Sequence, residues 1–260
     1  MGQKKNFNSL YRKDNNLEKI DVIILCGGLG TRLRPIIINK PKVLAKIGNQ
    51  TFLDILINNI SFYSFKNIIL CIGHLKDHIK RYFDYHSGYY NIKFSDEDEP
   101  LGTGGALKNA EPLIKSDPFI VMNGDSICNI DFRKFLDFHI NKKALLSMVL
   151  SKSTISKDYG NVILDESLRI INFKEKPIDS NEILINAGIY IMQKDIFFHM
   201  PDRKFFSLEY DLFPKLYGDM CFGFITDSEV IDIGTPERYR RAIDIYQNTT
   251  NMENNENILR

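Results

Sequence analysis

The sequence predicts an α/β fold with a Rossmann-like, mostly parallel mixed sheet flanked by helices. Two observations lead to this prediction. In the first half of the chain, short apolar runs typical of strands buried on both faces alternate with segments that have helical spacing. A glycine-rich segment at residues 26–33 directly follows the first apolar run, and open α/β sheets bind their ligands at such carboxyl ends of strands.

Each element of the first half follows from its own pattern. The run DVIILC at 21–26 is continuous and apolar, which suits a central strand, whereas NIKFS at 91–95 alternates. Residues 51–64 carry apolar side chains three and four positions apart, which indicates a helix. Up to residue 150 the sequence predicts strands over 21–26, 67–72, 91–95, 118–125 and 144–150, and helices over 51–64, 75–85, 103–114 and 131–140.

The pattern changes from about residue 160. NVILDESLRIINF at 161–173 predicts a hairpin with its turn near 165–167, because polar residues separate two apolar runs. Pro236 suits the first position of a helix. The rest of this half predicts a strand over 184–192, short helices over 194–199 and 208–217, two short strands within 221–234 and a helix over 236–246.

Composition limits the possible functions. The 260 residues are 43% hydrophobic and 26% charged, as in soluble globular proteins. Lys and Arg total 34 and Asp and Glu total 33, so the net charge of +1 argues against a nucleic-acid partner. No apolar run approaches the roughly 20 residues of a membrane span, and the polar N-terminus lacks the apolar core of a signal peptide. We therefore expect a cytoplasmic protein with no membrane partner.

The four cysteines predict neither a metal site nor disulfides. None of them forms a CxxC pair, and Cys26 and Cys71 lie inside apolar runs. We expect Cys26, Cys71, Cys128 and Cys221 to be buried and reduced.

The glycine-rich segment CGGLGTRL at 26–33 is the first candidate for a binding site. Glycines after a strand let the backbone approach a ligand closely, and successive backbone N–H groups form an anion-binding nest. Arg32 adds a planar guanidinium suited to phosphate oxygens. The segment lacks the Gly-Lys-Ser/Thr of a Walker A loop and the third glycine of a dinucleotide fingerprint, which disfavours an NAD-binding protein. On this segment alone, a purely structural turn stays open.

Further motifs make the segment part of a larger pattern. GGLGTRLRP at 27–35, followed by Pro41-Lys42, resembles the signature of the sugar-1-phosphate nucleotidylyltransferases. Five other motifs stand in the same order as in that family: PLGTGGALK (100–108), VMNGD (121–125), FKEKP (173–177), NAGIY (186–190) and VIDIGTPERY (230–239). The resemblance implies the nucleotide-diphospho-sugar transferase type of fold. One departure is Val43, where many members have a second proline.

The resemblance spans roughly residues 21–246 and suggests how the chain is organised. We expect one nucleotidylyltransferase domain over 20–246, with a nucleotide half over about 20–150 and a sugar-binding half over about 151–246. Residues 1–19 and 247–260 are polar, and we expect them to form a flexible leader and a flexible tail.

Three cations carry the chemistry that the resemblance implies. A sugar-1-phosphate oxygen attacks the α-phosphorus of a nucleoside triphosphate, and catalysis rests mainly on positioning and on cations near the phosphate oxygens. The resemblance assigns Arg32 to the leaving β- and γ-phosphates and Lys42 to the α-phosphate. It assigns Lys176 to the phosphate of the attacking sugar.

The resemblance also implies Mg²⁺, held by Asp125 and Asp232. Magnesium accepts one or two carboxylates together with substrate phosphates. Asp125 follows an apolar strand, where a turn or a helix cap would also explain an aspartate. Asp232 stands between two isoleucines, and a buried carboxylate is costly unless it is paired or bound to a metal.

In the family that the sequence resembles, a side chain three residues before the proline of PLGTGGALK reads the base, and the resemblance therefore assigns base recognition to Glu97, three residues before Pro100. A carboxylate only accepts hydrogen bonds, which matches the N1–H and N2–H donors of guanine, so Glu97 favours GTP. A solvated acidic turn is the alternative for residues 96–99. By resemblance, backbone groups complete the base pocket and the loop holds the nucleotide: Leu25, Gly27, Gly28, Gly30, Thr31 and Gly102, with Asp125 also near the nucleotide.

For the sugar, the resemblance places ligands at Gly160, Glu175, Asn186 and Gly188. The motifs FSLEYDLFP (206–214) and IDIGTPERYRRA (231–242) most resemble the branch that acts on D-glycero-D-manno-heptose 1-phosphate. We therefore expect a guanylyltransferase that makes an NDP-sugar and pyrophosphate. A heptose product would point to a bacterial surface polysaccharide.

Two alternatives stay open. The same chemistry can use UTP, dTTP or CTP with a hexose 1-phosphate. A regulatory subunit that binds nucleotide sugars without activity is a second possibility, disfavoured because all five cation and metal positions are present. The partners expected are a nucleoside triphosphate and a sugar 1-phosphate, and a homodimer stays possible.

Overall fold

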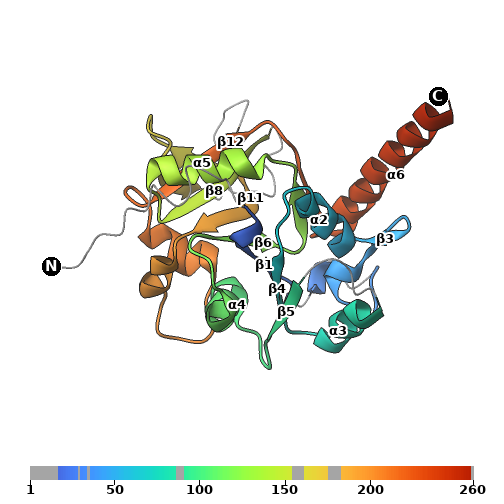
Figure 1. Cartoon of the computed structure of the whole chain (residues 1–260), viewed down its shortest axis with the longest axis horizontal. Coiled ribbons are helices and arrows are strands. Elements are labelled where there is room, and N and C mark those ends of the chain that lie inside the picture. Colours follow the sequence, from blue (N-terminus) through green and yellow to red (C-terminus); the bar gives the residue numbers. More distant parts are fainter. Residues whose placement is uncertain are drawn as a thin grey trace.

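A computed structural model of the chain describes residues 17–28, 30–33, 36–85, 91–153, 161–174 and 183–258. Within these residues a nine-stranded sheet forms the centre of the molecule (Figure 1). Its strands are β1 (Asp21–Leu25), β4 (Asn67–Ile72), β5 (Asn91–Asp96), β6 (Phe119–Asn123), β8 (Leu146–Ser153), β9 (Asn161–Leu164), β10 (Ile170–Lys174), β11 (Ile183–Met192) and β12 (Cys221–Thr226).

The sheet divides into a parallel and a largely antiparallel part. Strands β6, β1, β4 and β5 are neighbours and run parallel, as in a Rossmann-like half. Strand β11 pairs antiparallel with β6, β8 and β9, and β9 pairs antiparallel with β10. Strand β12 runs parallel to β8 at an edge. The predicted α/β fold is therefore confirmed, and the change in pattern near residue 160 marks the start of the β9–β10 hairpin.

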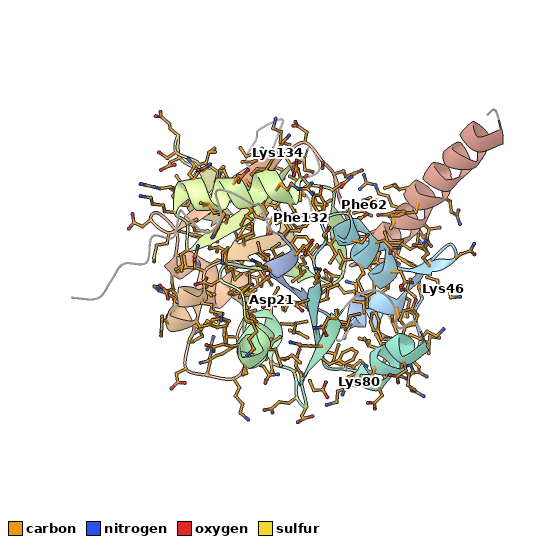
Figure 2. The ribbon with its side chains drawn as sticks, viewed as in Figure 1. Asp21, Lys46, Phe62, Lys80, Phe132 and Lys134 are labelled. Carbon is orange, nitrogen blue, oxygen red and sulfur yellow. The ribbon has the colours of Figure 1, made fainter. Side chains whose placement is uncertain are left out.

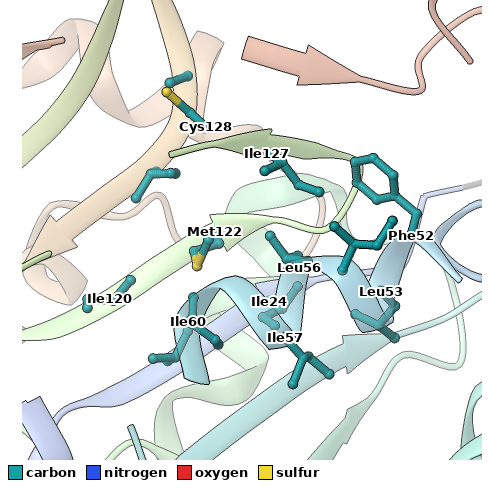
Figure 3. Packing of buried hydrophobic residues seen from close by; sticks show 14 of the residues in the cluster. Ile24, Phe52, Leu53, Leu56, Ile57, Ile60, Ile120, Met122, Ile127 and Cys128 are labelled. Atoms are coloured by element: carbon teal, nitrogen blue, oxygen red, sulfur yellow. The ribbon is translucent and has the colours of Figure 1, made fainter. Parts of the chain in front are cut away.

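Helices cover both faces of the sheet. They are α2 (Phe52–Ser61), α3 (Lys76–Tyr85), α4 (Gly102–Ala110), α5 (Phe132–Lys142) and α6 (Pro236–Ile258). Alternate residues of β1 pack in opposite directions: Ile24 joins the cluster that includes α2 and α5, whereas Ile23 joins the cluster that includes α4. Figure 3 shows Leu56 and Ile60 of α2 packed near Ile24 and Ile120 of the sheet. This double burial explains why the central strands are apolar along their whole length.

Local capping and amphipathic patterning define the helices. Thr51 and Asp54 form a reciprocal capping box at the start of α2. Asp131 accepts hydrogen bonds from two backbone N–H groups at the start of α5. Along α5, Phe132 is buried and Lys134 is exposed (Figure 2). Each predicted helix is present, and except at the C-terminal end of α6 the ends shift by only a few residues.

The structure differs from the prediction at both ends of the domain. Residues Leu17–Lys19 form a 3-10 turn, and Leu17 is buried although it falls in the expected leader. Helix α6 continues past residue 246 to Ile258, since no glycine or proline in that stretch ends it. Figure 1 shows its C-terminal part projecting from the rest of the molecule. In the described part of the chain, no helix has the length and apolar character needed to cross a bilayer.

Two small sheets complete the fold. Strands β2 (Lys46–Ile47) and β3 (Gln50–Thr51) form a hairpin before α2, and the sequence analysis does not predict it. Strand β7 (Ser126–Cys128), also not predicted, pairs antiparallel with β13 (Val230–Asp232). All four cysteines are buried and free, as predicted.

Candidate active site

A cavity of about 350 Å³ opens beside the carboxyl ends of strands β1 and β6. Ligands bind at this edge in open α/β sheets. Its walls come from the glycine-rich loop, from the residues after β5 and β6, and from the start of α4. The lining residues are Leu25, Cys26, Gly27, Gly28, Lys42, Val43, Glu97, Pro100, Leu101, Gly102, Thr103, Ala106, Asn123, Asp125 and Phe205.

The loop after β1 meets the cavity through its first glycines. A Cβ atom on Gly27 would lie 2.4 Å from Oε1 of Glu97, so only glycine fits there without moving that carboxylate. Gly28 borders open space, and Gly30 has a φ of +59°, which favours glycine. Thr31 and Arg32 begin the exposed turn η2 (Thr31–Leu33). The predicted loop residues are thus together, but neither Thr31 nor Arg32 is among the residues that line this cavity.

Glu97 is the most constrained acidic group in the cavity. It follows β5, its side chain is buried at 6% exposure, and its N–H donates to the carbonyl of Ile72. Oε2 accepts a 3.4 Å hydrogen bond from the N–H of Leu101, whereas Oε1 is buried without a partner among the described residues. Burial raises the pKa of this carboxyl above its ordinary value. A solvated acidic turn does not account for Glu97.

The start of α4 holds a distant segment of the chain. The N–H groups of Gly104 and Gly105 donate to the carbonyl of Phe206, and the N–H of Phe206 donates to the carbonyl of Leu101. Gly102 has a φ of +73°, and a Cβ there would lie 2.5 Å from the carbonyl oxygen of Phe206. The glycines of LGTGG therefore serve backbone packing. Gly102 also lines the cavity, in agreement with its predicted place in the base pocket.

Lys42 and Asp125 bring opposite charges to the cavity wall. The Nζ atom of Lys42 donates to Oδ2 of Asp125 at 2.7 Å, with side-chain exposures of 13% and 43%. Lys42 lies in the turn η3 (Lys42–Leu44) and Asp125 in the turn between β6 and β7. A phosphate ligand entering the cavity would therefore meet both a cation and a carboxylate.

The pairing of β7 with β13 brings Asp232 near Asp125. Asp232 is opposite Ser126, and the N–H of Ile233 donates to the carbonyl of Asp125. Oδ1 of Asp232 accepts from the N–H of Gly234 at 2.8 Å and from Nη1 of Arg238 at 3.3 Å. A carboxylate in the turn before β7 and another at the end of β13 are a donor set that suits magnesium. Asp125 lines the cavity, whereas Asp232 lines a small recess beside Arg238.

Arg238 differs in its surroundings from the two other arginines at the start of α6. The arginines of ERYRRA suggest a solvated helix face, but only Arg240 and Arg241 are exposed. The Arg238 side chain is mostly buried and pairs with Asp232. The ion pair offers a structural explanation of a buried aspartate that needs no metal.

Asn186 and Gly188, both predicted sugar ligands, also have structural roles. Oδ1 of Asn186 accepts from the N–H of Gly188 at 2.9 Å, and its Nδ2 donates to the buried Tyr190 hydroxyl at 2.7 Å. Gly188 has a φ of +72°, and a Cβ there would lie 2.8 Å from Nδ2 of Asn123. Both residues stabilise the irregular stretch of β11. The other predicted sugar-side residues, Gly160, Glu175 and Lys176, lie outside the described residues.

Two polar or aromatic residues that the sequence does not single out, Asn123 and Phe205, also line the cavity. Asn123, at the end of β6, lines it, and its Oδ1 is buried without a partner among the described residues. Phe205 lines the cavity from a segment about 100 positions away from α4. The first lies inside the motif VMNGD and could have been found there, whereas no local pattern marks the second.

A second recess adjoins this cavity through the glycine-rich loop. It encloses about 340 Å³ and shares Gly28 and Lys42 with the first cavity. Lys40 and His74 also line this recess, so it contains two further nitrogen-bearing side chains besides Lys42. Gly30, a predicted nucleotide-binding residue, lies here.

Comparison with known proteins identifies the family. The family described as Nucleotidyl transferase matches residues 21–249, which include every strand of the sheet and both cavities. This chain belongs to the nucleotidyl transferase family. The family resemblance noted in the sequence is thereby confirmed, whereas the role of each individual site residue stays a prediction.

Relatives of this nucleotidyl transferase include two D-glycero-α-D-manno-heptose 1-phosphate guanylyltransferases. The one from Aneurinibacillus thermoaerophilus is 39% identical, over 86% of this chain and 96% of the relative. The one from Campylobacter jejuni is 38% identical, over 85% of this chain and 97% of the relative. The crystal structure of HddC from Yersinia pseudotuberculosis complexed with GMP-PN has a TM-score of 0.78 and 33% identity, covering 87% of this chain and 99% of that one.

Proposed function

We propose that this chain transfers a guanylyl group from GTP to D-glycero-α-D-manno-heptose 1-phosphate. A phosphate oxygen of the sugar attacks the α-phosphorus of GTP, the bond from that phosphorus to its bridging oxygen breaks, and pyrophosphate leaves. Family membership supports nucleotidyl transfer. The names of two relatives, which this chain matches over nearly their whole length, support the heptose and the guanylyl group.

The unpaired Oε1 atom of Glu97 is the observation that carries the choice of base. A buried acceptor without a partner is costly, and a ligand that donates a hydrogen bond relieves this cost. The Watson–Crick edge of guanine presents two adjacent N–H donors, which suit a carboxylate. Uracil and thymine present a single N–H between two carbonyls, which a carboxylate would repel. The surroundings of Glu97 therefore support GTP over UTP and dTTP.

Three basic residues are proposed to support the phosphoryl chemistry, of which Lys42 lines the cavity. Lys42 lines both recesses, and we assign it to the α-phosphate, between base and leaving group. Arg32, on the exposed turn η2, would hold the β- and γ-phosphates from the solvent side. Lys176, assigned by resemblance to the sugar phosphate, completes the set. Such cations stabilise the charge that spreads over phosphate oxygens in the transition state.

Magnesium is part of the proposal. Asp125 would hold the ion together with phosphate oxygens, and Asp232 would act as a second ligand after exchanging its bond with Arg238. When bound, Mg²⁺ would neutralise phosphate charge and so favour attack on the α-phosphorus. The ion pair with Lys42 keeps Asp125 at the cavity wall in the protein alone.

Mannose 1-phosphate is the competing sugar. The chain is 31% identical to the mannose-1-phosphate guanylyltransferase of Mycobacterium tuberculosis, but it spans only 64% of that protein. The heptose relatives are more similar and agree in length. Asn186 and Gly188 are the described residues proposed to meet the sugar, with Asn186 retaining one amide N–H beyond its bond to Tyr190.

Pyrophosphate release tests the proposal. The purified chain is given each of GTP, ATP, CTP, UTP and dTTP with Mg²⁺, and heptose, mannose or glucose 1-phosphate. We expect release with GTP and the heptose phosphate above every other pair. Release with mannose 1-phosphate above the heptose would overturn the sugar, and preferred use of UTP or dTTP would overturn the base. No release with any pair would favour a regulatory subunit.

A further inference from the structure

We propose that Phe205 stacks on the base of the bound nucleotide and so covers the mouth of the cavity. The inference rests on the proposed function, in which the base lies over Glu97. It adds to that function a residue that binds the nucleotide base from the second half of the chain, outside the motifs of the glycine-rich loops.

The backbone around Phe205 is held in place on both sides. The neighbouring Phe206 is fully buried and makes three backbone hydrogen bonds to Leu101, Gly104 and Gly105. A Cβ on Gly105 would lie 2.1 Å from the carbonyl oxygen of Lys204, so the segment lies directly on the helix. Lys204 also forms an ion pair with Glu99 at 3.1 Å. Phe205 therefore stands between two anchored residues.

The side chain of Phe205 lies on the cavity rather than in the core. Phe205 lines the cavity and is 64% exposed, whereas Phe206 is 0% exposed beside it. The two rings thus point to different surroundings. An exposed aromatic ring at the mouth of a cavity gains burial only when something covers it, and a nucleobase presents a flat face of the right kind.

The rest of the cavity suits a base held between Glu97 and Phe205. Pro100, Leu101 and Ala106 also line the cavity and supply apolar walls. Glu97 offers an acceptor for the polar edge of the base, and Phe205 offers a ring for its face. Recognition by one edge contact and one stacked ring is a common way to hold a base.

The absence of tryptophan from the chain gives a direct test. F205W would introduce the sole tryptophan, and stacking of a base on its indole quenches the fluorescence. We expect saturable quenching by GTP and none by inorganic tripolyphosphate, which lacks a base. F198W is the matched control, since Phe198 is 87% exposed in the turn η5 (Lys194–His199) and does not line the cavity. Its emission should not change.

The outcomes separate this inference from the choice of base. Binding of GTP to F205W, measured by calorimetry, with unchanged emission would overturn the stacking. Quenching by UTP or dTTP in place of GTP would keep the stacking and overturn guanine. Equal quenching in F205W and F198W would also overturn the proposal, because it would indicate a signal unrelated to the cavity.

Kinetics of F205A supply a second measurement. The loss of base–aromatic stacking should raise the KM for GTP by roughly ten-fold or more and leave kcat nearly unchanged. F205Y keeps an aromatic ring and should retain the wild-type KM. F205L keeps an apolar side chain but has no ring to stack on the base, so its KM should resemble that of F205A. The Tm should stay the same, since the replaced side chain is exposed. A fall in kcat with an unchanged KM, or wild-type kinetics in F205A, would contradict the proposal.

Discussion

Gly27 and Glu97 are in direct contact: a Cβ atom on Gly27 would lie 2.4 Å from Oε1 of Glu97. The contact joins the loop after β1 to the residue after β5, two strands away in the sheet. Oε1 is buried and has no hydrogen-bond partner among the described residues, so an N–H donor of a ligand would supply the bond that it lacks. Glycine at this position thus leaves room for the Glu97 carboxylate beside the loop.

Glu97→Gln should weaken the use of GTP. An amide cannot accept from both N–H groups of guanine, and a hydrogen bond to a charged group contributes about 1.5–3 kcal/mol. We expect kcat/KM for GTP to fall roughly 10- to 200-fold in a pyrophosphate-release assay. ITP, which lacks the N2 amino group, should be a poorer substrate than GTP for the wild type and nearly equal to GTP for the variant. An unchanged GTP/ITP ratio in E97Q would contradict this role.

The same substitution should not destabilise the fold at pH 7. Burial raises the pKa of the Glu97 carboxyl in the folded protein. Ionisation of this carboxyl therefore opposes folding once the pH rises above the pKa that the group has in the unfolded chain. The neutral amide lacks that cost. We therefore expect the Tm of E97Q at pH 7 to equal or exceed that of the wild type, with the difference shrinking as the pH approaches 4. A large loss of Tm would mean that Glu97 acts mainly as a structural residue.

Gly27→Ala should lower the Tm of the protein, whereas Gly28→Ala should leave it unchanged. The added methyl group at Gly27 would displace the Glu97 carboxylate, whereas a methyl group at Gly28 has no protein atom within 4 Å. Overpacking of this kind costs about 1–3 kcal/mol. Thermal unfolding of the two variants, measured side by side, should show a lower Tm for G27A alone. Equal Tm values would show that Glu97 moves aside freely.

Asp125→Asn should abolish turnover while the fold survives. The substitution removes the proposed magnesium ligand and the partner of Lys42, which lies 2.7 Å away. We expect pyrophosphate release to fall at least about 100-fold, with circular dichroism unchanged. Titration with Mg²⁺ should show no recovery at high metal concentration if the carboxylate holds the ion. Near-normal turnover would remove Asp125 from the proposed metal site.

Because His139 is buried, we expect the protein to lose stability at mildly acidic pH. The ring is fully buried, with Ser147 and Gln193 as its partners, and burial lowers its pKa to about 3. The unfolded chain therefore binds a proton that the folded chain does not, and stability falls as the pH decreases below about 6.5. The expected loss is about 1.4 kcal/mol for each pH unit between 6.5 and 3.

Denaturant unfolding of the wild type and of His139→Gln between pH 5 and 7 measures this effect. The variant should lack the part of the pH slope that comes from His139, although it is less stable at pH 7. Comparing the two proteins removes the contribution of the other titrating groups. Identical slopes would mean that the buried ring takes up a proton without cost.

The sequence predicts the framework of this molecule well because its signals are local. Continuous apolar runs require burial on both faces, as Ile23 and Ile24 show by packing in opposite directions. The glycine loop after β1 and Glu97 after β5 meet because parallel strands end at one edge of the sheet. The position of the main cavity follows from these local rules.

Contacts between distant segments could not be predicted in the same way. The docking of Phe206 on Gly104 joins residues about 100 positions apart, and no periodicity identifies that pairing. In the sequence, Arg238 looks like its neighbours Arg240 and Arg241. In the structure, β13 places Asp232 beside it, and the two side chains form an ion pair. Asn186 shows the related ambiguity of a polar residue, which can bind a sugar or stabilise an irregular strand with the same amide group.

The ratio of kcat/KM for GTP and UTP, with heptose 1-phosphate as the sugar, tests the central claim most directly. In the proposed complex the buried Glu97 carboxylate would accept from two donors on guanine but would face a carbonyl on uracil, so we predict a ratio above about 100 for the wild type. In E97Q the ratio should fall toward one. A wild-type ratio of one or less would contradict the assignment of Glu97 as the group that selects guanine.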